Sequence, residues 1–189
     1  SDVINALNEI LNSSKSLLNY TYEQILDEPE DLPTWRKYLD FYSKEIDKIL
    51  EINKKKYECF IANDNSNLQV VVSGLKKDIN LLSDDLNNKK IKNLKLNVSA
   101  PFHCKYMKTA SEKMTSYIND LNMKELEKPI ISNVTANETR SVKEIKSLLI
   151  SQIERKVRWL ESVEYMINNG VKNFVEIGPG KVLSGLIKR

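Results

Sequence analysis

The chain holds a single histidine, His103, in the stretch NVSAPFHCKYM, which runs from Asn97 to Met107. An imidazole titrates near neutral pH, so this side chain could act as a general base that takes and returns a proton. Without further context, a capped or half-buried loop histidine is the better explanation of such a residue. The choice depends on whether the rest of the chain supplies a nucleophile and a group that orients the ring.

The two cysteines give little support to thiol or metal chemistry. Cys104 follows His103 directly, and a cysteine beside a base can act as a thiolate nucleophile. Adjacent side chains on an extended chain point to opposite sides, so we expect Cys104 to pack in the interior rather than meet the imidazole. Cys59 is distant in sequence, and two separated cysteines with one histidine predict no metal site and a reducing compartment.

The composition is typical of a globular protein with no nucleic-acid or membrane partner. The 189 residues carry a net charge of +3, and 41% of them are hydrophobic and 29% charged. The lysine-rich stretches at 53–56 and 87–92 have no interleaved aromatic residues, so they predict solvated faces and not a nucleic-acid interface. No apolar run reaches the roughly 18 residues of a membrane span, and residues 1–10 show no secretory signal.

The spacing of apolar residues alternates along the chain between helical and extended periods. We predict helices over residues 2–12, 43–52, 76–86, 105–121, 141–153 and 157–169, and a last helix after the Gly-Pro-Gly turn at 178–180. We predict strands over residues 36–43, 57–63, 68–74, 91–98 and 129–135, a turn at 64–67, and a buried parallel strand over 173–178. From 36 to 98 this order is typical of a small ferredoxin-like α+β unit.

Five segments in a consistent order carry a resemblance to a known family. Together they resemble malonyl-CoA:acyl carrier protein transacylase, the freestanding enzyme of type II fatty-acid synthesis, over roughly residues 44–189. The segments are ANDNSNLQVVVSG (62–74), NVSAPFHCKYM (97–107), PIISNVTA (129–136), VRWLESVEYM (157–166) and VEIGPGKVLSGLIKR (175–189).

The resemblance implies an α/β fold, with a partial α/β-hydrolase-like core and an inserted ferredoxin-like α+β subdomain. Residues 1–35 would be a helical N-terminal remnant of the large subdomain, residues 36–98 the small subdomain, and residues 99–189 the C-terminal part of the large subdomain. The histidine of the SAPFH block is the family's general base, so that role carries over to His103. A backbone carbonyl orients this histidine in the family, and the matching position is Gln152, which taken alone would be a solvated helix residue.

The activity implied is transfer of a malonyl group from malonyl-CoA to the phosphopantetheine thiol of acyl carrier protein, through an acyl-serine intermediate. The resemblance implies no metal and no cofactor besides the coenzyme A thioester and acyl carrier protein substrates, a monomer, and a bacterial cytoplasm or a plastid stroma. Acyl carrier proteins are acidic, so basic residues such as Lys181, Lys188 and Arg189 could steer the partner.

The nucleophile half of the family pattern does not occur in the 189 residues. The sequence contains no GQGSQ segment, no GHSLGE elbow with its serine, and no serine with glycine on both sides. One hypothesis is an acyltransferase whose serine, arginine and oxyanion-hole glutamine lie in sequence that is not shown. The alternative is a truncated, catalytically inactive module that binds acyl carrier protein. Because the surviving motifs are intact, omission or truncation of the nucleophile segment is a better explanation than a degenerate form of the enzyme.

Overall fold

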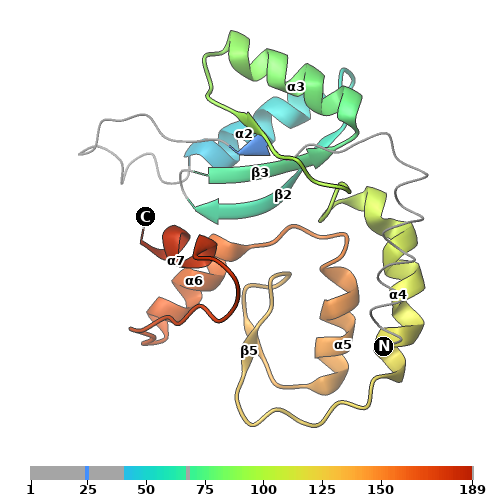
Figure 1. Cartoon of the computed structure of the whole chain (residues 1–189), viewed down its shortest axis with the longest axis vertical. Helices are drawn as coiled ribbons and strands as arrows, with labels where there is room; N and C mark the ends of the chain where they lie inside the picture. The colour runs from blue at the N-terminus through green and yellow to red at the C-terminus, as the bar shows by residue number, and fades with distance from the viewer. Residues whose placement is uncertain (1–23, 26–40, 67–68, 189) are drawn as a thin grey trace.

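The computed structural model describes residues 24–25, 41–66 and 69–188, and it shows two parts (Figure 1). The first part, which we call the sheet lobe, is a four-stranded antiparallel sheet with two helices on one face. Its elements in chain order are β1 (Gln24–Ile25), α2 (Phe41–Ile52), β2 (Cys59–Ser66), β3 (Gln69–Gly74), α3 (Lys76–Asn88) and β4 (Leu94–Lys95).

The sheet has the strand order β2-β3-β1-β4, and its centre lies on β3. Val72 faces Ile61 of β2 in the register and Gln24 of β1 on the other side. The helices cover the sheet because their apolar residues recur every three or four positions and form one stripe, as Ile79, Leu82 and Leu86 do in α3. All three of these side chains are fully buried in a single core shared by both helices, β2 and β3.

Within the sheet lobe, the helices expected over 43–52 and 76–86 are confirmed, but three strand predictions need correction. Residues 41–43 of the strand expected over 36–43 belong to helix α2, and the strand that pairs with β3 is Gln24–Ile25. Strand β2 continues through Ser66, where a turn was expected, with irregular register after Ile61. The strand expected over 91–98 is reduced to Leu94–Lys95, which forms an edge strand of the sheet, and Leu94 is exposed. The helix expected over 2–12 and residues 36–40 lie outside the described residues.

The second part follows residue 98 and is built mostly of helices. Its elements are η2 (Lys105–Met107), α4 (Lys108–Asp120), β5 (Ile130–Ile131), β6 (Glu138–Thr139), α5 (Val142–Ser151), α6 (Trp159–Asn168) and α7 (Val182–Ile187). Helices α4 and α5 pack side by side (Figure 1) around a second, smaller core that includes Met107, Met114 and Ile118. The loop at 99–104 packs against this core, because Ala100 is one of the buried residues of the core.

The helices expected in the second part are present, whereas its two strands differ from prediction. The strand expected over 129–135 is a two-residue strand, β5, paired antiparallel with β6. The prediction of a buried parallel strand over 173–178 was wrong. Residues 171–177 have no regular secondary structure, and Val175 and Ile177 are 82% and 93% exposed. A parallel strand needs neighbours that supply hydrogen bonds and cover both faces, and the described residues provide none beside this segment.

A short joint at residues 156–158 connects the two parts. The main chain of Val157 donates to Ala62 O at 2.8 Å and accepts from Asp64 N at 2.9 Å, so it adds a single parallel bridge to the edge of β2. Next to it, Lys156 Nζ lies 3.5 Å from the largely buried Asp64 carboxylate. The joint fixes the end of α5 and the start of α6 relative to the sheet lobe. Among the described helices, none is long and apolar enough to cross a membrane.

Candidate active site

His103 lies in a loop whose backbone is held in an uncommon conformation. Its φ is +60°, in the left-handed region that few residues other than glycine adopt, although histidine is among the more tolerant. The loop keeps this conformation because it is anchored on both sides of the histidine: Pro101, two positions earlier, is fully enclosed, and Cys104, the next residue, is 2% exposed. Two main-chain bonds close it, from Phe102 N to Ala100 O and from Met107 N to Cys104 O, each 2.9 Å. A strained, packed backbone of this kind is often found at functional sites.

The imidazole of His103 is oriented by a main-chain carbonyl. Its Nδ1 lies 2.8 Å from Gln152 O, so the contact expected between these two residues is present. A carbonyl oxygen only accepts hydrogen bonds, which assigns the proton to Nδ1 as the donor. The other ring nitrogen, Nε2, then keeps a free lone pair, the form that a general base requires.

Gln152 can offer its carbonyl because it caps the C-terminal end of α5. Its own N–H donates to Leu148 O at 2.9 Å, as in the helix, but the last carbonyls of a helix have no partner within it. The carbonyl of Gln152 is therefore free to accept from His103.

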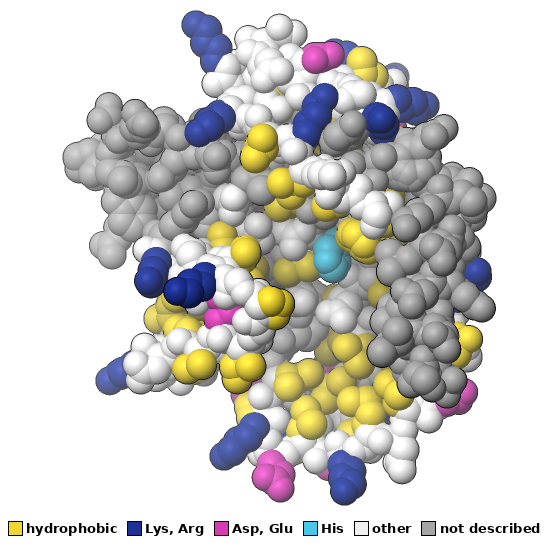
Figure 2. All heavy atoms as spheres, in the orientation of Figure 1, with side chains coloured by type: hydrophobic (Ala, Val, Ile, Leu, Met, Phe, Trp, Pro, Cys, Tyr) yellow, Lys and Arg dark blue, Asp and Glu magenta, His cyan; other side chains and the backbone are white. Residues whose placement is uncertain are grey.

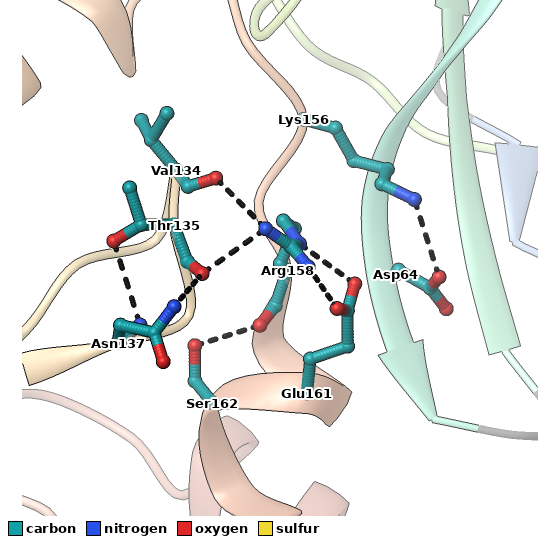
Figure 3. A network of polar contacts seen from close by, with 8 residues as sticks. All are labelled: Asp64, Val134, Thr135, Asn137, Lys156, Arg158, Glu161 and Ser162. Carbon is teal, nitrogen blue, oxygen red and sulfur yellow. Dashed lines mark hydrogen bonds and ion pairs between the residues drawn. The ribbon is translucent and has the colours of Figure 1, made fainter. Parts of the chain in front are cut away.

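The end of α5 and the start of α6 are held by a polar network around Arg158 (Figure 3). The guanidinium donates to Thr135 O at 3.0 Å and to Val134 O at 3.4 Å, and it pairs with both carboxylate oxygens of Glu161. Hydrogen bonding to Arg158 lowers the pKa of the Glu161 carboxyl below its usual value. The network fixes the turn at 132–137, from which Asn133 Nδ2 reaches Gln152 Oε1 at 3.5 Å.

Sequence reasoning did not single out Arg158, Glu161 or Asn133, although all three lie within the quoted segments. The spacing of Arg158 and Glu161, three residues apart at the start of a helix, was a readable signal for an ion pair. The acceptors at Val134 and Thr135 were not readable, because they are main-chain atoms brought in by the turn.

Cys104 packs as expected and does not face the imidazole as a nucleophile. Its Sγ donates to Pro101 O at 3.1 Å in the interior of the loop. Burial raises the pKa of Cys104 to about 11, so the thiol stays protonated at neutral pH. A thiolate mechanism at this site therefore has no support from the structure.

The imidazole is half-buried and remains accessible from one side. Figure 2 shows the histidine side chain in a hollowed part of the surface, between hydrophobic side chains of both parts. In the part of the chain that the structure describes, no three acidic, cysteine or histidine side chains gather as metal ligands would.

Comparison with curated proteins finds transacylases that are considerably longer than this chain. The malonyl CoA-acyl carrier protein transacylase of Bacillus subtilis (strain 168) is 42% identical over 130 residues, which cover 68% of this chain and 41% of the relative. The protein of the same name from Staphylococcus aureus (strain COL) is 41% identical over 131 residues, which cover 68% and 42%. The chain thus spans about two fifths of the length of these relatives. No family model matches it.

Solved structures of the same kind superpose on nearly the whole chain. An acyl-carrier-protein S-malonyltransferase from Bartonella henselae has a TM-score of 0.80 and 30% identity, over 95% of this chain and 55% of that one. The malonyl CoA-acyl carrier protein transacylase from Coxiella burnetii has a TM-score of 0.84 and 25% identity, over 100% and 56%. A malonyl-transacylase solved in complex with its type II polyketide acyl-carrier protein has a TM-score of 0.75 and 27% identity, over 96% and 55%. With this α/β fold and the matched sequence, the chain belongs to the malonyl CoA-acyl carrier protein transacylase family.

Proposed function

We propose that this chain supplies the general base of a malonyl transfer from malonyl-CoA to the phosphopantetheine thiol of acyl carrier protein. The observation that carries the proposal is the 2.8 Å contact between His103 Nδ1 and Gln152 O. It leaves Nε2 unprotonated, and an imidazole in that state can take the proton of a serine hydroxyl as the hydroxyl attacks the malonyl thioester. The same nitrogen returns the proton to the leaving coenzyme A thiolate.

In the second half-reaction the roles repeat with a different thiol. The imidazole takes the proton of the phosphopantetheine thiol, whose sulfur attacks the acyl-serine ester, and the serine oxygen leaves as it recovers the proton from the ring. Gln152 acts through its main-chain carbonyl only, so its side chain is a minor contributor in this proposal.

The nucleophilic serine, the arginine for the malonyl carboxylate and the oxyanion-hole glutamine would come from family segments that this chain does not match. We propose that the sheet lobe is the family's ferredoxin-like subdomain, because its order β1-α2-β2-β3-α3-β4 and its strand order β2-β3-β1-β4 fit that arrangement. Residues 99–189 would be the returning part of an α/β-hydrolase-like core. The boundary at residue 36 stays a prediction, and β1 at Gln24–Ile25 lies before it.

The proposed partner is acyl carrier protein, as in the complex of the related malonyl-transacylase with its own carrier protein. Lys181 and Lys188 are exposed and could attract an acidic carrier, whereas Arg189 lies outside the described residues. We propose further that transfer needs no cofactor, that the active protein is a monomer, and that it works in a bacterial cytoplasm or a plastid stroma.

A chimera tests the proposal directly. The 130 matched residues of this chain replace their counterparts in the Bacillus subtilis relative, and malonyl transfer to acyl carrier protein is measured. We expect an active chimera, and we expect His103→Ala within it to slow formation of the acyl-enzyme by about 10²–10⁴-fold, as for a lost general base. Gln152→Ala is the matched control, because it keeps the main-chain carbonyl and should change the rate little.

The alternative, an inactive module that binds acyl carrier protein, predicts a different outcome. A folded chimera that binds acyl carrier protein but forms no acyl-enzyme would favour the module. An active chimera that His103→Ala leaves unchanged would remove the role of His103. The 189-residue chain alone should gain no malonyl group from malonyl-CoA, and a stable adduct on Cys104 would restore the thiol hypothesis.

A further inference from the structure

A second hydrogen bond joins the two chain segments that carry His103 and Gln152. Helix α4 continues from the loop of His103 through η2, and the Oγ of its Ser111 donates to Glu154 Oε1. Glu154 lies two positions after Gln152, in the turn that ends α5. The two segments are therefore connected by this bond as well as by the 2.8 Å contact of His103 Nδ1 with Gln152 O.

Both partners of this second bond are held in place. Ser111 is 4% exposed, and its main-chain oxygen accepts from Thr115 Oγ1 at 2.8 Å. Its Oγ also lies 2.9 Å from Lys108 O, but a hydroxyl has one proton and the Glu154 carboxylate is the stronger acceptor. The half-buried Glu154 donates from its main-chain N–H to Ser151 O at 3.2 Å, which fixes the turn. The bond is thus a firm cross-link between α4 and the end of α5.

The place of this cross-link matters because α4 and α5 pack side by side in opposite directions (Figure 1). At the other end of the pair, Lys146 Nζ near the start of α5 donates to Asn119 O near the end of α4, at 2.6 Å. Ser111 and Glu154 connect the end at which His103 meets Gln152. The helix pair therefore carries a polar cross-link at its catalytic end and another far from it.

The contact at His103 Nδ1 is sensitive to small shifts of the end of α5, because an N–H···O bond needs a donor–acceptor distance of roughly 2.7–3.2 Å. Phe102 and Ile153 pack against the smaller core nearby, but apolar packing is not directional and does not fix a distance so closely. The φ of +60° at His103 is also a conformation that persists only where its surroundings impose it. A directional cross-link beside the loop supplies this constraint.

We propose that Ser111 and Glu154 are positioning residues for the general base. Their bond holds the carbonyl of Gln152 against Nδ1 of His103 and so keeps the proton on that nitrogen. Without the bond, the end of α5 shifts and the ring populates the tautomer with the proton on Nε2, which has no lone pair there to accept another. Neither residue touches the reacting atoms. The consequence for catalysis rests on the proposed function, whereas the tautomer can be measured without any reaction.

Nitrogen-15 NMR of the chain labelled at histidine reads this tautomer directly, because His103 is the only histidine. At a pH where the ring is neutral, the wild type should show a protonated Nδ1 and an unprotonated Nε2. Glu154→Met removes the acceptor at similar volume, so the two signals should move toward each other as the tautomers mix. Glu154→Gln removes the same charge but keeps an oxygen acceptor, and it should keep the wild-type spectrum.

Ser111→Ala removes the donor and should have the same effect as Glu154→Met, so either variant decides if the other does not fold. Lys146→Met is the matched control, because it removes the cross-link at the far end of α4 and α5 and should leave the spectrum unchanged. In the chimera described above, Glu154→Met should lower kcat for malonyl transfer by about 10-fold with little change in KM, as for a misplaced catalytic group. Glu154→Gln should recover most of this loss.

The possible outcomes separate this inference from the proposed function. A wild-type tautomer in both Glu154→Met and Ser111→Ala would overturn the inference and leave the proposed function standing. Mixed tautomers in Glu154→Gln would assign the effect to charge, and mixed tautomers in Lys146→Met would assign it to a general loosening of the helix pair; either result would also overturn it. A chimera that forms no acyl-enzyme, beside the expected spectra, would contradict the proposed function and leave the inference intact.

Discussion

Two apolar stretches of similar sequence character lie in opposite environments. In β3, Val70 and Val72 are fully buried and Val71 is 4% exposed, whereas Val175 and Ile177 near the C-terminus are 82% and 93% exposed. Both stretches are short, β-branched and bounded by glycine, as strands are. The difference lies in their neighbours: β3 pairs with β2 and β1 and is covered by two helices.

The comparison shows that a strand-like sequence becomes a buried strand only where other elements pair with it and cover it. The N–H and C=O groups of β3 find partners on both sides, and its side chains enter a core formed by α2 and α3. Each buried valine or isoleucine contributes about 1.5–3 kcal/mol, but only where other elements remove it from water. The C-terminal stretch has the same capacity without those elements. Its apolar sequence alone therefore does not bury it. The following substitutions measure how strongly each of the two stretches is packed.

The largest contrast is expected for the same aspartate introduced at the two valines. Val72→Asp places an unpaired charge in the sheet core and should cost more than about 4 kcal/mol, enough to unfold the lobe. Val175→Asp at an exposed position should change the free energy of unfolding by less than about 0.5 kcal/mol. Urea unfolding followed by circular dichroism measures both. A large loss for Val175→Asp would mean that the C-terminal stretch is already packed in the isolated chain.

Alanine substitutions at two glycines, one in each region, are expected to change the free energy of unfolding in opposite directions. A Cβ at Gly74, the last residue of β3, would lie 3.0 Å from Glu58 O and 3.1 Å from Cys59 Sγ. Since a main-chain oxygen cannot move away cheaply, Gly74→Ala should destabilise the lobe by about 2–3 kcal/mol. Gly185 lies inside α7 with nothing within 4 Å, so Gly185→Ala should stabilise the helix, by at most about 1 kcal/mol. Thermal unfolding of the two variants should shift in opposite directions.

The parts of the fold that could be predicted from sequence are those whose signal is local. Helix α3 was predicted because Ile79, Leu82 and Leu86 repeat at helical spacing, and this stripe is what the core requires. The extent of β2 beyond residue 63 was not predicted, because Asp64 and Ser66 are turn-forming types that the pairing with β3 holds extended. The strand expected at 173–178 failed for the reason given above, since its neighbours are not part of the described chain.

In the candidate site, too, some features could be predicted from the sequence and others could not. His103 and Gln152 were identified from the motif and the family resemblance, and the contact between them is present. The positive φ of His103 could not be predicted, because histidine does not require it and the buried loop imposes it. The bonds from Arg158 to Val134 O and Thr135 O could not be predicted, because these acceptors are main-chain oxygens of a turn more than twenty residues earlier.

Arg158 provides the next substitution, because it holds α6, the helix that leads to the C-terminal stretch. Arg158→Met keeps the aliphatic packing and removes the bonds to Thr135 O, Val134 O and Glu161. Hydrogen bonds of a charged group to partly buried acceptors predict a loss of about 1–2 kcal/mol. Arg140→Met is the control, since Arg140 is exposed and its side chain donates, among the described residues, to Glu127 O. Equal stability of the two variants would show that the joint does not depend on this network.

The smallest effect is expected for the free energy of unfolding at acid pH. The pKa of Glu161 is lowered by its hydrogen bond to Arg158, so its folded-state pKa lies below the usual 4.5. A carboxyl of this kind stabilises the fold above its unfolded pKa, and the contribution is lost as the pH falls below 4.5. The difference between the wild type and Glu161→Gln should therefore shrink between pH 6 and pH 3. It should stay under about 1 kcal/mol, because the pair is partly exposed.

Glu164→Gln, at an exposed position of the same helix, should follow the wild-type profile throughout. Urea unfolding at several pH values decides the matter, and a constant offset for Glu161→Gln would contradict the assignment of this ion pair.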